Sequence, residues 1–93
     1  MAFTRYIKNE HSQEYEATIA HNYDHYAWGP VMEINLAIDI KSSFDEAKHL
    51  DLVFYTKERR YECKQPIPEN FEYTYGMIIE ELNDTLGDLW GLD

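Results

Sequence analysis

Residues 31–41 constrain the fold more than any other part of this chain. Two sets of side chains alternate there without a break, one apolar (Met32, Ile34, Leu36, Ile38, Ile40) and one mostly polar (Val31, Glu33, Asn35, Ala37, Asp39). A period of two places the sets on opposite faces of a β-strand. The pattern therefore predicts a central strand with one face on the core, in an antiparallel sheet whose other face meets solvent.

Shorter segments on either side of it have strand patterns as well. Residues 3–8 form a short strand candidate, and residues 15–21 alternate with Tyr15, Ala17, Ile19 and His21 on one side, although a helix over 14–22 is also compatible. Residues 52–56 and 61–65 flank a polar turn and predict a hairpin. Pro66 and Pro68 end its second strand, because proline cannot donate to a ladder.

Two helices are expected. Ser43 and Glu46 have the spacing of a capping box, which predicts a short helix near 44–50. A longer helix is predicted near the C-terminus, with Asn70 or Thr74 as its cap. Its apolar side chains recur at helical spacing: Phe71, Tyr75, Ile78, Leu82, Leu86 and Leu89.

These elements define an α+β fold. We expect a small antiparallel β-sheet of about four or five strands, the short helix near 44–50, and the C-terminal helix packed across one face. With 44% hydrophobic and 15% aromatic residues, the 93-residue chain has enough apolar material for a core. It contains no linker-like or repeated stretch, so a single compact domain over residues 1–93 is predicted.

The net charge and the cysteine content limit the possible binding partners and the cellular compartment. A net charge of −10 disfavours direct binding to nucleic acid or to an anionic membrane, since both require a basic surface. The single cysteine, Cys63, excludes an internal disulfide framework and suggests a reducing compartment. No apolar stretch has the length of a signal sequence or a membrane span. A cytoplasmic location is therefore expected.

The predicted C-terminal helix carries an ordered row of carboxylates. After Lys64 the chain has no Lys or Arg, and its acidic residues there are Glu69, Glu72, Glu80, Glu81, Asp84, Asp88 and Asp93. Glu80, Asp84 and Asp88 are spaced i, i+4, i+8, which gives one carboxylate every ~6 Å along a helix, with Glu81 beside them. Like charges at this spacing cost a few tenths of a kcal/mol each, and those near the C-terminus also oppose the helix dipole.

Three explanations of this row remain open. The carboxylates give solubility, or they dock on a basic protein surface in place of nucleic-acid phosphates, or cations of the same protein or a second copy cover them (Lys57, Arg59, Arg60, Lys64). Duplex DNA carries one phosphate per strand every ~3.4 Å, so the row alone is too sparse for close mimicry. Other acids would have to fill it in: Glu81, Glu72, Glu69, or the sheet acids Asp39, Asp45, Glu46 and Asp51.

A second candidate surface is aromatic. Tyr23, Tyr26 and Trp28 crowd one loop, and side chains of this kind anchor protein interfaces. No Lys or Arg lies between Lys8 and Lys41, which disfavours base stacking because stacking sites interleave cations. The loop either packs on the sheet or contributes to a protein-binding patch with Glu72 and the acidic row.

Motifs for catalysis or metal binding are missing from the sequence. His21 and His25 have i, i+4 spacing, but His25 falls in an expected loop and no glutamate follows His21 as metalloprotease motifs require. Cys63 has no His or Asp partner nearby in sequence. We therefore expect neither an enzyme, nor a metal site, nor a cofactor.

In size, acidity and lack of catalytic motifs the chain resembles phage-borne proteins that block bacterial restriction or CRISPR systems. This resemblance of composition implies an inhibitor that mimics DNA, acts in the host cytoplasm and occludes a basic nucleic-acid-binding protein. Two alternatives stay open. One is an acidic immunity or antitoxin-type partner of a basic nuclease toxin, and the other is a structural module that self-associates as a homodimer.

Overall fold

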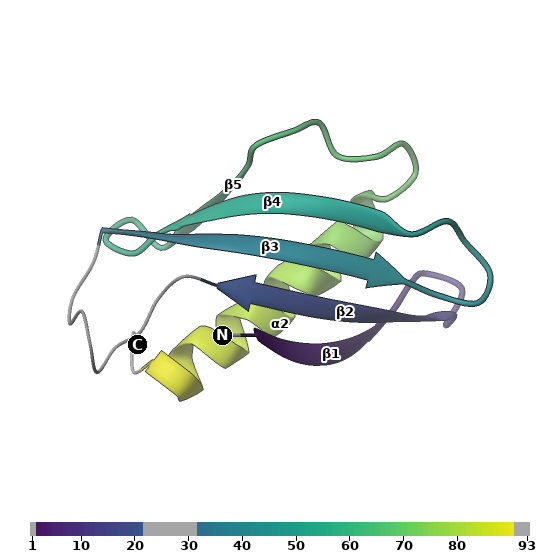
Figure 1. The fold of residues 1–93 in the computed structure, drawn as a ribbon, viewed down its shortest axis with the longest axis horizontal. Coiled ribbons are helices and arrows are strands. Elements are labelled where there is room, and N and C mark those ends of the chain that lie inside the picture. Colours follow the sequence, from purple (N-terminus) through teal and green to yellow (C-terminus); the bar gives the residue numbers. More distant parts are fainter. Residues whose placement is uncertain (1, 22–31, 91–93) are drawn as a thin grey trace.

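The structure, a computed structural model, shows five strands followed by one helix within the residues that it describes (Figure 1). It describes residues 2–21 and 32–90, with the backbone alone for 86–90. The elements are β1 (Ala2–Lys8), β2 (Glu14–His21), β3 (Glu33–Lys41), β4 (Lys48–Tyr55), β5 (Arg60–Cys63) and α2 (Glu72–Trp90).

The strands form one antiparallel sheet in the order in which they occur along the chain, β1-β2-β3-β4-β5. β3 lies at its centre, as its alternation predicts, and Ile34 to Ile40 bury every second side chain. Its register aligns Ile38 with Ile19 of β2 and Leu50 of β4, so buried side chains meet across the strands. Met32 departs from the prediction: it precedes β3 and is 75% exposed.

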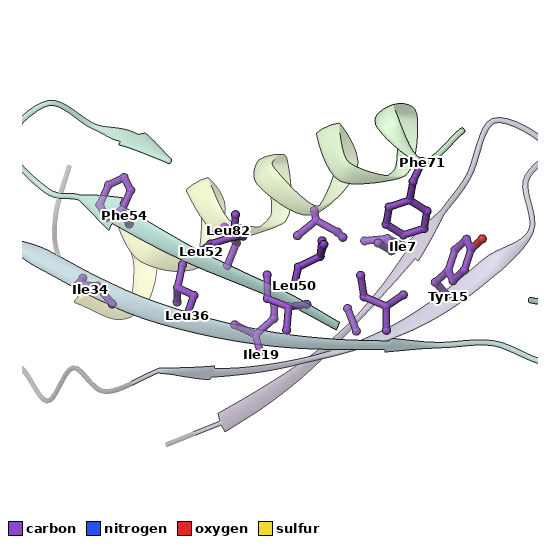
Figure 2. Packing of buried hydrophobic residues seen from close by; sticks show 14 residues of the cluster. Ile7, Tyr15, Ile19, Ile34, Leu36, Leu50, Leu52, Phe54, Phe71 and Leu82 are labelled. Carbon is purple, nitrogen blue, oxygen red and sulfur yellow. The ribbon is translucent and has the colours of Figure 1, made fainter. Parts of the chain in front are cut away.

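Helix α2 runs diagonally across one face of the sheet (Figure 1), and the core lies between the two (Figure 2). Phe71, Ile78 and Leu82 point from the helical segment into this layer, where they meet the buried side chains of the strands. The opposite face of the sheet is not covered by any other element within 2–21 and 32–90. We call it the open face. The predicted α+β class and the helix on one sheet face are confirmed.

The predicted short helix at 44–50 is wrong. Residues 42–47 form an irregular connection, and β4 begins at Lys48 because Leu50 continues the alternation of Leu52 and Phe54 into the core. The Ser43–Glu46 box is replaced by a local turn. The Ser42 hydroxyl accepts the Asp45 N–H (3.1 Å), and the Asp45 carboxylate accepts the Glu46 N–H (2.8 Å).

Two positive φ angles shape the connections around β5. The predicted β4–β5 hairpin is confirmed, and Arg59 (φ 57°) supplies the left-handed turn residue in a turn that has no glycine. Asn70 also has a positive φ (61°), which is not the conformation of an N-cap. Thr74 lies inside α2 and is buried, so neither predicted cap holds this position. Phe71 precedes the helix instead, and its carbonyl accepts the Tyr75 N–H.

Candidate functional site

The side of α2 that is turned away from the sheet is acidic. Its exposed side chains include Glu72, Tyr73, Glu80 and Asp84, and we call these four residues the outer face of α2. Glu80 and Asp84 lie one helical turn apart, about 6 Å along the axis. Leu82 and Ile78 lie on the opposite side, fully buried against the sheet. Helical periodicity thus separates apolar from acidic side chains, as the sequence predicts.

Tyr73 is the residue on this face that the sequence analysis missed. Its side chain is 52% exposed, which is high for a large aromatic group. Because it lies seven residues before Glu80, it points in nearly the same direction two turns earlier. Its position outside the apolar arc of the helix was the available signal. Exposed tyrosines are preferred anchors of protein interfaces.

The carboxylates of the outer face are not neutralised by cations in the part of the chain that the structure describes. The Lys, Arg and His nitrogens there lie more than 4.0 Å from Glu72, Glu80 and Asp84. Glu81 differs from them: it is half-buried at the rim, 4.0 Å from the guanidinium of Arg5 on β1. The predicted row therefore keeps Glu80 and Asp84 as free charges, while Glu81 has a cation at the limit of pairing distance.

Two cations of the basic patch Lys57, Arg59, Arg60 and Lys64 have partners away from the outer face of α2. Arg60 donates to Glu58 (2.9 Å) and to Glu62 (3.3 Å). Lys64 donates to Asn35 on the open face (3.3 Å). These contacts hold Arg60 and Lys64 away from the outer face of α2.

The sheet acids do not extend the row either. Asp39 and Asp51 lie on the open face, opposite to α2, where both contact His49. Asp45 accepts hydrogen bonds from Lys48 (2.9 Å) and from the hydroxyl of Tyr15 (2.8 Å). The described carboxylates of the outer face are thus more widely spaced than phosphates.

The Asp45 cluster shows how strongly this protein perturbs some of its titrating groups. Hydrogen bonding to Lys48 and Tyr15 lowers the pKa of Asp45 to about 2. Burial, followed by the bond to Asp45, raises the pKa of Tyr15 to about 12. The Tyr15 ring also packs edge-on against Phe71 and Phe44, so the cluster joins β2, the 42–47 connection and the start of α2. Its groups are committed to one another, which marks the cluster as structural.

Several predicted partner-binding residues are not described. Tyr23, Tyr26 and Trp28 lie outside the described residues. Asp88 lies within α2 at the expected i+4 position after Asp84, but only its backbone is described. Their part in binding stays a prediction.

The described histidine and cysteine candidates, His21 and Cys63, contact neighbouring side chains of the sheet and its connections. His21 is buried, with its ring 6.0 Å from that of Phe3, and His25 lies outside the described residues. Cys63 is half-buried in β5, with its sulfur 3.8 Å from the side-chain oxygen of Gln65. Within residues 2–21 and 32–85, no three His, Cys, Asp or Glu side chains are arranged to hold a metal ion. None of the described helices has the length and apolar character needed to cross a membrane.

Comparisons with protein-family models, with curated proteins and with solved structures found no match to this chain. The fold and surface of the described residues define a small α+β protein whose C-terminal helix turns an acidic side to solvent.

Proposed function

We propose that this protein is a non-enzymatic inhibitor that binds a basic, nucleic-acid-binding protein through the outer face of α2. The carboxylates of this face take the place of phosphates, and the bound protein loses access to its nucleic acid. A phage origin and action in the host cytoplasm are part of the same proposal.

One observation carries the proposal: Glu80 and Asp84 leave negative charge uncompensated on one side of α2, whereas several carboxylates of the sheet and its turns have a cation close by. Lys41 lies 3.3 Å from Glu16, and Lys48 lies 2.9 Å from Asp45. Glu80 and Asp84 lie one turn apart with no described cation within 4.0 Å. A cationic partner surface gains Coulomb energy on docking there without first breaking an internal ion pair.

Tyr73 gives this face more than charge. An interface needs an apolar anchor near its centre as well as charged groups that steer the encounter. Tyr73 offers a ring with a polar tip next to Glu72 and two turns before Glu80, and a tyrosine can also stack on a guanidinium of the partner. An exposed aromatic on the same side of a helix as unpaired carboxylates suits a surface rich in Arg and Lys.

The wide spacing of the carboxylates defines the partner further. Glu80 and Asp84 are about 6 Å apart along the helix, compared with ~3.4 Å between phosphates of one DNA strand. The face therefore suits a groove whose cations are spread out, and it need not copy a DNA backbone phosphate by phosphate. An immunity-type partner of a basic nuclease would use the same face, and the identity of the bound protein separates the two roles.

The test begins with an affinity pull-down from host lysate at low and high salt, followed by calorimetry with the protein that is retained. Affinity should fall at least tenfold between about 0.1 and 0.5 M salt, because screening shortens the range of exposed charges. The variant Glu72→Lys/Glu80→Lys/Asp84→Lys should lose binding and inhibition while its circular dichroism stays unchanged. All three side chains are exposed, so their reversal leaves the core intact.

A matched control separates the face from total charge. Glu10→Lys/Glu14→Lys/Glu33→Lys changes the net charge from −10 to −4, as the α2 variant does, but its three residues are exposed on the sheet side. Equal loss of binding by the two variants would show that net charge alone matters. Retained inhibition by the α2 variant would leave its carboxylates a solubilising role only. A dimer in light scattering that salt does not dissociate would favour the self-associating module.

A further inference from the structure

His49 lies on the open face between two carboxylates. Its Nδ1 is 2.6 Å from an oxygen of Asp39 on β3, and its Nε2 is 3.0 Å from an oxygen of Asp51 on β4. Asp39 and His49 are directly opposite each other in the β3–β4 register, and Asp51 follows His49 by two residues on the same face. The three side chains thus form a continuous hydrogen-bonded chain, Asp39–His49–Asp51, across the two strands.

The two short contacts favour the protonated form of the ring. A carboxylate only accepts hydrogen bonds, and a neutral imidazole has a single N–H. Both contacts are therefore satisfied only by the imidazolium, which donates from each nitrogen. The hydrogen bond to Asp39, followed by that to Asp51, accordingly raises the pKa of His49, against the smaller effect of burial.

The charged side chains around Asp39, His49 and Asp51 come from β2, β3 and the end of β5. On β3, Lys41 lies two residues beyond Asp39, but it pairs with Glu16 of β2. Toward β5, Lys64 and Asp51 line one shallow hollow of about 240 Å³ together with the titratable His21 of β2, and Lys64 is bonded there to Asn35. Thr18 of β2 faces Asp39 and carries no charge.

We infer that Asp39, His49 and Asp51 act as a proton-operated clasp on the open face: it is closed by the imidazolium and opens on the Asp51 side when His49 becomes neutral. The formal charge of the three groups then changes from −1 to −2. The bond to Asp39 is the shorter one, so the remaining N–H stays on Nδ1. The freed Asp51 carboxylate then faces the hollow that it shares with Lys64. The clasp and α2 lie on opposite sides of the sheet, so this inference does not rest on the proposed function.

Side-chain NMR tests the clasp directly on the full chain. The His49 Cε1–H resonance should titrate with a midpoint above ~6.5, the value of a free histidine side chain. The Asp51 carboxyl carbon should shift with the same midpoint, because its partner is lost in the same step. Asp39→Asn and Asp51→Asn should each lower the midpoint, and Asp39→Asn should lower it more. A His49 midpoint at or below ~6.5, or one that neither variant moves, would overturn the clasp.

Unfolding measurements give a second readout. Because the pKa of His49 is raised in the folded state, its stabilisation is fully present below the unfolded value of ~6.5 and is lost as pH rises through the folded pKa. The urea midpoint of the wild type should therefore exceed that of His49→Gln at low pH, and the difference should shrink as pH rises through that range. A difference that is constant with pH would mean that His49 only packs, and the clasp would be rejected.

Discussion

Leu82→Ala is the substitution that most directly tests how α2 is held. Leu82 is 0% exposed and lies in the middle of the layer between the helix and the sheet (Figure 2). Truncation of a buried leucine to alanine costs roughly 2–5 kcal/mol, because apolar contacts are lost and the cavity closes only in part. Leu82 meets the buried strand side chains on one side and its own helix on the other, so we expect about 3 kcal/mol.

That loss is large against the total stability of so small a chain. At roughly 0.05–0.15 kcal/mol per residue, 93 residues have a free energy of unfolding of about 5–14 kcal/mol. With a urea slope of about 1–3 kcal/mol per molar, a loss of 3 kcal/mol lowers the unfolding midpoint by roughly 1–3 M. Urea titration followed by circular dichroism at 222 nm measures this shift through the helix itself.

Glu80→Ala is the matched control, since Glu80 lies two residues earlier in α2 and faces solvent. Exposed substitutions usually change stability by less than about 0.5 kcal/mol, and this one also relieves the repulsion between Glu80 and Asp84. Two results would contradict this role of Leu82: a cost of less than about 1 kcal/mol for Leu82→Ala, or unfolding of the two variants at the same urea concentration. Either result would mean that α2 does not pack on the sheet through this side chain.

Three further outcomes follow from individual contacts. Gly76→Ala should raise the free energy of unfolding by about 1 kcal/mol, because Gly76 is exposed in α2 and an added Cβ meets no atom within 4 Å. Thermal or urea unfolding measures the change, and a lower midpoint than that of the wild type would contradict the open surroundings of this position. The pKa of Asp45 is lowered to about 2, chiefly by the bond to Lys48, so its stabilisation is present above pH ~3.8 and disappears as pH falls toward 2. Asp45→Asn should therefore unfold more easily than wild type at pH 5 but not at pH 2, and an equal difference at both would exclude linkage. Tyr61→Phe should lower the free energy of unfolding by about 1 kcal/mol, because the Tyr61 hydroxyl donates a hydrogen bond to Asn83 (3.0 Å) and so joins β5 to α2. An unchanged urea midpoint would mean that a hydrogen bond from the hydroxyl to water is equally favourable.

The fold was largely predictable because periodicity reports burial. The alternation from Ile34 to Ile40 fixed β3 and its buried face, and the helical spacing of Ile78 and Leu82 fixed the inner side of α2. The prediction failed at 44–50, where a local capping signal competed with the alternation of Leu50 with Leu52. Core burial decided the outcome, since a strand places Leu50 in the core next to Leu52.

The candidate site was predictable only in part, for a different reason. Exposure of Glu80 and Asp84 follows from the helical period alone. The commitment of Asp39 and Asp51 to His49, and of Asp45 to Lys48, depends on strand register and on turn geometry. The pattern of side chains along one strand does not show which residues of the neighbouring strand lie opposite. For this reason the sequence analysis offered Asp39, Asp45 and Asp51 as additions to the acidic row of α2, although they contact other residues in the structure.

The difference between the two sides of the molecule has a simple geometric origin. In the sheet, neighbouring strands bring side chains of distant residues about 5 Å apart, so Glu16 finds Lys41 and Asp39 finds His49. On the outer face of α2 the near neighbours are residues three or four positions away in the same helix, and after Lys64 the chain has no Lys or Arg to place there. Among the described elements, the sheet lies on the other side of α2, so its cations reach only the rim, as Arg5 does at Glu81. The charge of Glu80 and Asp84 therefore remains in solvent, and the paired reversal variants measure whether the proposed partner supplies cations to it.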